Sequence, residues 1–167
     1  LRWALDHPYA VRKLVLVASS PCFQQRDDWP VAMRREVLAQ FAGDLRQNYQ
    51  ATLRRFIALQ AMGGNASREV LRGLQDRLFD RGQPVEAVLG SGLEILRDED
   101  LRHELQHLDQ PTLLIYGERD ALTPAAAGRW LAGAIADSEL LLLPDASHAP
   151  FISHADVFTA KVLEFLR

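Results

Sequence analysis

Two short apolar runs in the C-terminal half constrain the fold of this chain most strongly. Residues 112–116 and 139–143 are rich in leucine and lack the alternation of apolar and polar residues that marks a half-exposed strand. Such runs are typical of strands that are covered on both faces in a parallel sheet. Asp120 follows the first run and His148 follows the second. Because functional groups in parallel sheets gather beyond the carboxyl ends of the strands, we expect both side chains to lie on one rim.

The rest of the chain alternates between strand and helix patterns. A buried strand is predicted at residues 11–19, after a helix that ends before Pro8. Helical spacing then extends from residue 28 to about residue 108, so we expect an all-helical insertion between two strands. Individual helices are predicted at residues 51–62, 68–79, 85–96, 124–135 and 155–166. This order of elements predicts the α/β class with a parallel sheet.

Two local patterns predict where helices begin and break. Ser153 and Asp156 are three residues apart and form a capping pattern for the last helix. The segment Gly90-Ser91-Gly92 has neither a preceding strand nor a following lysine, so a helix break is favoured over a phosphate-binding loop.

Composition limits the classes of function. The 167 residues carry a net charge of −3, which gives no electrostatic reason to expect a nucleic-acid partner. Cys22 is the only cysteine, which excludes an internal disulfide and favours a reducing compartment such as the cytoplasm. The longest apolar runs are too short to cross a bilayer, so no membrane role is expected. The chain opens on Leu1 inside an amphipathic pattern, and we expect it to be truncated there.

Asp120 and His148 have the residue types and the chain order of a nucleophilic hydrolase. A serine nucleophile needs an imidazole base, and the base needs a carboxylate that fixes its tautomer and stabilises the imidazolium. In hydrolases whose nucleophile lies on a Gly-x-Ser-x-Gly turn, the order is nucleophile, acid and base. No such turn occurs in this sequence, and Ser19 and Ser20 lead into Pro21, which suits a turn instead.

Both residues also have a purely structural interpretation. An aspartate after a strand often caps the next helix, and a lone loop histidine is commonly a solvated residue. The joint placement of Asp120 and the loop histidine at strand ends, in the correct order, favours a catalytic pair. His154 is a weaker base candidate because it belongs to the turn before the last helix. Three further histidines are expected on the surface, namely His7, His103 and His107.

Five arginines lie in the helical insertion, although the chain is acidic overall. On the pattern alone, a solvated helix face is favoured over a docking surface for an acidic partner. These residues are Arg54, Arg55, Arg68, Arg72 and Arg77.

Several longer stretches carry a resemblance to a known family. They are residues 17–23 (VASSPCF), 55–60 (RFIALQ) with Met62-Gly63, 92–96 (GLEIL), 114–120 (LIYGERD) and 147–154 (SHAPFISH). Together they resemble the biotin-pathway esterases that hydrolyse the methyl ester of pimeloyl-acyl carrier protein, a group within the α/β-hydrolase superfamily. The stretches extend over almost the whole chain, and the first and last are unusually specific for this group.

The resemblance implies the C-terminal part of an α/β-hydrolase parallel sheet, with a helical lid inserted between strands. Residues 1–27 would form a core strand with a flanking helix end, residues 28–91 the lid, and residues 92–167 the remaining core with the triad acid and base. The serine elbow, the oxyanion-hole residues and the first strands of the sheet would lie upstream of Leu1. The chain alone should therefore not hydrolyse esters by the family mechanism.

The resemblance also implies roles for individual residues. Asp120 is matched to the triad acid and His148 to the base, and His148 would also touch the substrate. No metal or organic cofactor is implied. The residues that would line the acyl pocket are Phe56, Ile57, Ala58, Leu59 and Gln60.

A carrier-protein docking surface is implied on the lid. Arg55, Arg68 and Arg72 fall where the family carries basic residues that face the acidic carrier protein. Ala51 stands at a further position of this kind, so one basic residue of the family pattern is missing here. For these three arginines the resemblance favours docking over a solvated face.

Two other functions stay open. One keeps the triad and replaces the substrate with a small generic ester or lactone. The other makes the chain a noncatalytic module, or a half that must pair with another polypeptide. The apolar strand at residues 13–18 would then lack a neighbour, and an unpaired strand edge favours self-association.

Overall fold

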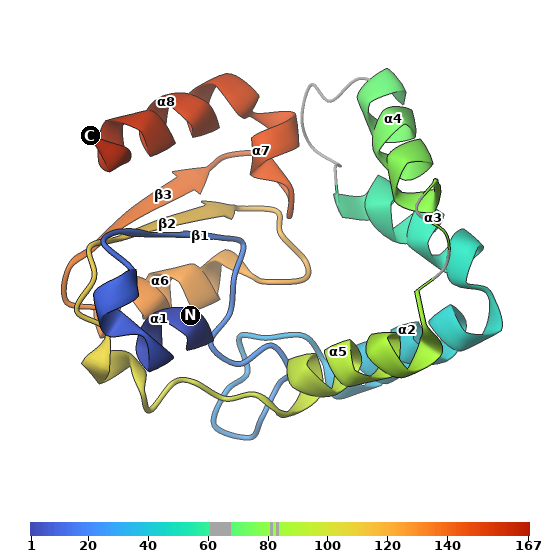
Figure 1. Cartoon of the computed structure of the whole chain (residues 1–167), viewed down its shortest axis with the longest axis horizontal. Coiled ribbons are helices and arrows are strands. Elements are labelled where there is room, and N and C mark those ends of the chain that lie inside the picture. Colours follow the sequence, from blue (N-terminus) through green and yellow to red (C-terminus); the bar gives the residue numbers. More distant parts are fainter. Residues whose placement is uncertain (61–67, 81, 83) are drawn as a thin grey trace.

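Three parallel strands form one sheet in this computed structural model, which describes residues 1–60, 68–80, 82 and 84–167. The sheet order is β1 (Leu14–Val17), β2 (Thr112–Gly117) and β3 (Ser138–Leu143), as Figure 1 shows. The helices are α1 (Arg2–Asp6), η1 (Pro8–Ala10), α2 (Arg35–Gln47), α3 (Tyr49–Gln60), α4 (Arg68–Phe79), α5 (Glu86–Asp98), η2 (Leu105–His107), α6 (Ala125–Ala134), α7 (Pro150–Ser153) and α8 (Ala155–Leu166). The predicted α/β class with a parallel sheet is confirmed.

Strand β2 is the centre of the core, because it pairs with both other strands and all its residues are buried. Its side chains alternate between the two faces of the sheet. Leu114 and Tyr116 pack with residues of α1 and α6 on one face, whereas Leu113 and Ile115 pack with residues of α8 on the other. Burial on both faces explains the unbroken apolar run in the sequence. Each large aliphatic side chain buried here contributes about 2 kcal/mol.

Among the helices that the structure describes, α2 to α5 form the helical insertion between β1 and β2, which we call the lid, and the short helix η2 follows them. Helix α2 packs against α3 and α5, and α3 also packs against α4 (Figure 1). The predicted helical insertion is confirmed, although its first helix starts at Arg35 and is preceded by a loop. The predicted boundary between residues 91 and 92 lies inside α5. In the part of the chain that the structure describes, no helix has both the length and the apolar character needed to cross a membrane.

Two local predictions about helix ends are wrong. Ser153 does not cap the last helix, because it belongs to the unpredicted helix α7 and its hydroxyl donates to the Ala149 carbonyl. Helix α8 instead begins after His154, without a side-chain capping hydrogen bond. Gly90 and Gly92 do not break a helix either. They lie within α5, where the Ser91 hydroxyl donates to the Ala87 carbonyl.

The segments that lead into and out of the lid are joined to each other at its base. Cys22 forms an antiparallel bridge with Asp100, and the Leu101 N–H donates to the Pro21 carbonyl at 2.8 Å. The Trp29 indole N–H donates to the Cys22 carbonyl at 2.8 Å. The first and last residues of the insertion are therefore held side by side, which fixes where the lid leaves the sheet.

An ionic cluster reinforces this junction. The Arg102 guanidinium donates two hydrogen bonds to the Asp100 carboxylate, at 2.8 and 2.7 Å, and lies 3.0 Å from the Asp28 carboxylate. It also lies over the Trp29 ring, 5.2 Å from the centroid. The Arg102 hydrogen bond holds the pKa of the Asp100 carboxyl below its ordinary value. We refer to Asp28, Trp29, Asp100 and Arg102 as the lid-root cluster.

Replacing Arg102 with glutamine should lower the free energy of unfolding. Asp100 would then keep a largely buried carboxylate without its bidentate partner, at a cost of about 2 kcal/mol, between the values for exposed and fully buried ion pairs. Urea unfolding of the variant measures this loss. Arg97→Gln is the matched control, because it removes an exposed pair with Asp98 and should leave the midpoint unchanged. Equal midpoints for both variants would contradict a stabilising lid-root cluster.

Candidate active site

The loops after β2 and β3 bring Asp120 and His148 together. The Asp120 Oδ2 atom is 2.9 Å from His148 Nδ1, within hydrogen-bond distance. The Asp120 side chain is fully buried, whereas the His148 side chain is 28% exposed. Among the described residues, His148 Nε2 has no hydrogen-bond partner, so this nitrogen remains available for a reacting group. This geometry is the one expected of a carboxylate that orients an imidazole base.

The Asp120 carboxylate accepts hydrogen bonds on both oxygens. Oδ1 accepts from the backbone N–H groups of Leu122 at 2.8 Å and Thr123 at 3.0 Å. Oδ2 faces the His148 ring and the Thr123 hydroxyl, which is 2.7 Å away. The two carboxylate oxygens of Asp120 therefore have different partners, and its catalytic role stays a prediction. Its Oδ1 atom stabilises the loop before α6, and its Oδ2 atom orients the imidazole.

These hydrogen bonds decide the ionisation of Asp120. Burial by itself raises the pKa of the carboxyl, because it penalises the charged form. The hydrogen bond to His148 and those from Thr123 outweigh burial, so the pKa of Asp120 lies below its ordinary value. The acid is therefore ionised at neutral pH and can stabilise a positively charged imidazole.

Gly117 allows the two loops to approach each other closely. A Cβ atom on this residue would lie 2.3 Å from the backbone oxygens of Ala146 and Ser147, a distance that no real side chain tolerates. The contact is continued by the Arg119 N–H, which donates to the Ala146 carbonyl at 2.9 Å, and by an ion pair between Arg119 and Asp145. The absence of a side chain at Gly117 therefore brings the acid loop within reach of the base loop.

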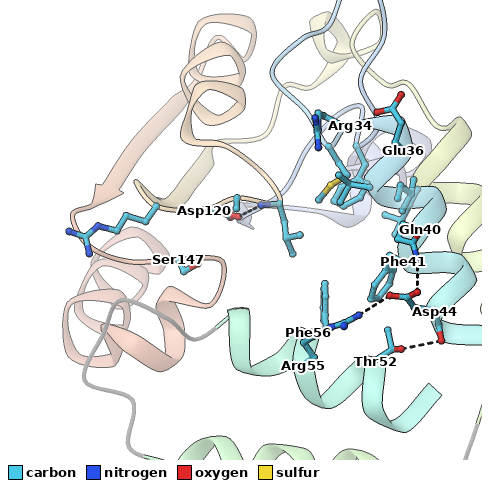
Figure 2. A pocket seen from close by; sticks show the side chains of 18 residues that line it. Arg34, Glu36, Gln40, Phe41, Asp44, Thr52, Arg55, Phe56, Asp120 and Ser147 are labelled. Carbon is cyan, nitrogen blue, oxygen red and sulfur yellow. Dashed lines mark hydrogen bonds and ion pairs between the residues drawn. The ribbon is translucent and has the colours of Figure 1, made fainter. Parts of the chain in front are cut away.

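A cavity of about 820 Å³ lies between the lid and these loops. Figure 2 shows Asp120 and Ser147 on one side of the cavity and side chains of α2 and α3 on the other. Its volume falls within the usual range for small-molecule sites. The lining residues are Phe23, Met33, Arg34, Glu36, Val37, Leu38, Gln40, Phe41, Asp44, Thr52, Arg55, Phe56, Leu96, Arg119, Asp120, Ala121, Leu122 and Ser147.

The lid wall of the cavity carries a polar network centred on Asp44. Its Oδ1 accepts from the Gln40 amide at 2.6 Å, and its Oδ2 accepts from the Arg55 guanidinium at 2.7 Å (Figure 2). The Thr52 hydroxyl donates to the Asp44 carbonyl and ties α3 to α2. Within the described residues, no three His, Cys, Asp or Glu side chains gather into a candidate metal site. The network gives the lid wall a polar patch beside the rings of Phe41 and Phe56.

Among the described side chains, one of the predicted substrate-binding residues lines this cavity. Phe56 does so, and its ring lies 4.9 Å from that of Phe41. Ile57 and Ala58 follow it on α3 but are not among the lining residues, and neither is His148, although its neighbour Ser147 is. The two remaining predictions, the side chains of Leu59 and Gln60, lie outside what the structure describes. These five residues and the histidine stay predictions as substrate contacts.

The predicted docking arginines occupy different settings. Arg55 lines the cavity and pairs with Asp44, although two thirds of its side chain is exposed. Arg72 is exposed on α4. The side chain of Arg68 lies outside what the structure describes. Their role in docking stays a prediction.

The sequence interpretation missed two groups of residues. Gln40, Asp44 and Thr52 belong to the polar network on the lid wall, but the sequence pattern does not distinguish them from ordinary exposed helix positions. Thr123 contacts both members of the acid–base pair. The spacing Asp120-x-x-Thr123 carried a usable signal, because an aspartate in a loop commonly accepts from the backbone two or three residues further on.

Gly117→Ala should destabilise the protein, because the new methyl group meets backbone atoms of the facing loop that cannot rotate away. We expect a loss of about 3 kcal/mol in the free energy of unfolding. Chemical denaturation measures it. Gly133→Ala is the matched control, since nothing lies within 4 Å of a Cβ at that helical position, and it should be neutral or slightly stabilising. A Gly117→Ala variant as stable as the Gly133→Ala variant would contradict the close approach.

Comparison with curated proteins finds relatives over nearly the whole chain. A pimeloyl-[acyl-carrier protein] methyl ester esterase of Nitrosospira multiformis is 39% identical over 164 residues, which cover 98% of this chain and 62% of the relative. An esterase of the same name from Pectobacterium atrosepticum is 43% identical over 162 residues, which cover 97% of this chain and 63% of the relative. The chain thus spans less than two thirds of the length of these relatives.

Solved structures and a family model agree with the observed fold. The esterase EaEST from Exiguobacterium antarcticum matches with a TM-score of 0.89 at 23% identity, covering 98% of this chain and 60% of that protein. The enol-lactonase from Burkholderia xenovorans LB400 matches with a TM-score of 0.80 at 26% identity, covering 98% and 59%. The family model of the alpha/beta hydrolase fold matches residues 1–155. This chain belongs to the α/β-hydrolase fold family.

Proposed function

We propose that this chain supplies the acid and the base of a carboxylesterase that hydrolyses the methyl ester of pimeloyl-acyl carrier protein in biotin synthesis. The observation that carries the proposal is the 2.9 Å contact between Asp120 and His148 beside a cavity of about 820 Å³. The curated relatives that bear the name of this esterase support the substrate. A cytoplasmic reaction suits the single, buried Cys22.

His148 acts as the general base in this proposal. Its Nδ1 is engaged with Asp120, so Nε2 takes the proton of the serine hydroxyl as that oxygen attacks the ester carbonyl carbon. When the tetrahedral intermediate collapses, the bond to the methoxy oxygen breaks and His148 returns the proton to form methanol. Water then attacks the acyl-serine with the same proton transfers and releases the acid. Asp120 stays ionised and stabilises the imidazolium.

The serine and the oxyanion-hole donors come from polypeptide outside these 167 residues. The sequence contains no Gly-x-Ser-x-Gly turn, and the match to the Nitrosospira relative leaves part of that protein uncovered. Without a nucleophile and oxyanion donors, the chain by itself is expected to be inactive toward esters.

The cavity suits an acyl group with an apolar middle and polar ends. The rings of Phe41 and Phe56 give the lid wall an apolar surface against which a run of methylene groups can pack. Gln40, Asp44 and Arg55 offer donors and acceptors to the amide-bearing arm through which a carrier protein holds its acyl group. The ester end would then lie toward Asp120 and His148.

The carrier protein is proposed to dock on the lid through Arg55, Arg68 and Arg72. An acidic partner is attracted to clustered positive charge on one surface, which speeds association and fixes orientation. Arg72 has the exposure that docking needs. Arg55 is shared with Asp44, so part of its charge is compensated within the lid.

A hydrolase of small esters or lactones is the second candidate. The pairing of Arg55 with Asp44, together with the neutral Ala51, favours it because both reduce the positive charge available to an acidic partner.

The third candidate function is a noncatalytic half that associates with another polypeptide through β1. Among the described residues, β1 has β2 as its only ladder partner, which leaves its other edge for a further strand.

Charge reversal at the docking arginines separates the first two candidates. The test uses a completed enzyme, defined as this chain joined to the part of the Nitrosospira esterase that the match leaves uncovered. Changing Arg68 and Arg72 to glutamate should lower kcat/KM for a carrier-linked methyl ester about tenfold or more, with short methyl esters still hydrolysed. Adding Arg55→Glu should deepen the loss.

Arg77→Glu is the matched control for this experiment. Arg77 is exposed on the same helix as Arg72 but about 140° further around its axis, so its reversal should change carrier-linked hydrolysis little. Reversal variants that hydrolyse both substrates like the parent enzyme would count against carrier docking and favour the small-ester candidate.

A further inference from the structure

Thr123 lies where the ends of all three strands meet. Its Oγ1 atom is 2.9 Å from the Ala18 carbonyl oxygen after β1 and 2.7 Å from Asp120 Oδ2 after β2. The same oxygen is 3.2 Å from His148 Nδ1 after β3. The residue is 2% exposed, so water does not compete for these contacts. A buried hydroxyl in this position touches both members of the acid–base pair.

The hydroxyl has a single proton and two acceptors beside it. Asp120 Oδ2 is the closer of the two, and its negative charge makes it the stronger acceptor. With this bond formed, the carboxylate accepts four hydrogen bonds, two on each oxygen, which fills its ordinary capacity. Removal of the hydroxyl would leave the His148 ring as the one partner of Oδ2 among the described residues.

The backbone at the end of β1 supports the same contact. Ala18 has a φ of +43°, in the left-handed region that an alanine rarely adopts. Its N–H donates to the Ile115 carbonyl at 2.9 Å, and its carbonyl oxygen faces the Thr123 hydroxyl. Such a conformation persists only where neighbouring contacts hold it. Thr123 is thus packed between a fixed strand end and the carboxylate.

We propose that Thr123 is a positioning residue whose hydroxyl fixes the Asp120 carboxylate in the orientation that faces His148 Nδ1. Its effect on catalysis rests on the proposed esterase function, whereas its effect on the carboxylate does not. A carboxylate held by donors on both oxygens cannot turn away from the imidazole. The base is therefore presented in one tautomer and one orientation to the serine that it serves.

The first test follows the pH dependence of stability in the full 167-residue chain. His148 and Tyr116 are the titratable groups that face Asp120. Because the pKa of Asp120 is lowered in the folded state, its contribution to stability is present above the ordinary carboxyl range and is lost as pH falls through that lowered value. Thr123→Val removes one stabilising bond and raises the folded-state pKa of Asp120, so the stability lost on acidification should be smaller than in the parent chain and complete at a higher pH.

Two variants make this test specific. Thr123→Ser keeps the hydroxyl and should restore the parent pH dependence. Thr112→Val removes another buried hydroxyl, one that donates to the Gln110 carbonyl at 2.8 Å far from the site. It should lower stability alike at every pH. Urea unfolding at a series of pH values gives these comparisons.

The second readout is the activity of the completed enzyme. Thr123→Val should lower kcat about tenfold with little change in KM, as expected for the loss of one hydrogen bond to a charged group, and Thr123→Ser should recover most of it. The proposal is overturned if Thr123→Val loses as much stability on acidification as the parent chain, or if the serine variant behaves like the valine variant. If Thr123→Val changes the pH dependence of stability but the completed enzyme has no esterase activity, the proposed function is refuted and the positioning role is supported. An active enzyme whose Thr123→Val variant keeps the parent pH dependence of stability would support the proposed function and refute the positioning role.

Discussion

The close packing of the loop after β2 on the loop after β3 is the constraint on which the rest of the site depends. Gly117, the last residue of β2, has no room for a Cβ atom because the backbone oxygens of Ala146 and Ser147 lie too close. This approach brings a buried carboxylate within 2.9 Å of an imidazole. Burying a carboxylate is costly unless its oxygens are hydrogen-bonded, and here His148, Thr123 and the backbone N–H of Leu122 provide those bonds. The same contacts that compensate burial also fix the direction of the acid.

The position of the lid is fixed by the two adjoining segments through which the chain enters and leaves it, rather than by packing on the sheet. Its helices pack mainly on one another, and the chain enters and leaves the lid through adjoining segments that Arg102 and Trp29 hold together. This arrangement places the Asp44 network opposite the Asp120 loop across the cavity (Figure 2). In the proposed enzyme, the lid side of the cavity would select the substrate and the loops after β2 and β3 would supply the acid and the base, and the lid-root cluster helps to fix how these two parts are placed.

The sequence predicted the parts of the structure that local pattern decides. The unbroken apolar runs of β2 and β3 indicated a buried parallel sheet, and the strand-end placement of Asp120 and His148 brought both to one rim. Side-chain contacts across the fold were not predictable in this way. In the sequence, Thr123 looks like an ordinary loop residue, and only the fold places the Ala18 carbonyl beside it. Asp44 likewise looks like a solvated helix residue, and only the packing of α3 on α2 places Arg55 beside it. Ser153 fitted a capping pattern, but the short helix α7 takes up that segment.

The central claim is that Asp120 and His148 together polarise a serine hydroxyl supplied by another stretch of polypeptide. Its most direct test is the rate at which a fluorophosphonate labels that serine in the completed enzyme, followed by mass spectrometry. The account predicts one label per molecule, with the rate falling by a factor of about 10⁴ in His148→Gln and by a comparable factor in Asp120→Asn. Labelling of both variants at the parent rate would contradict it.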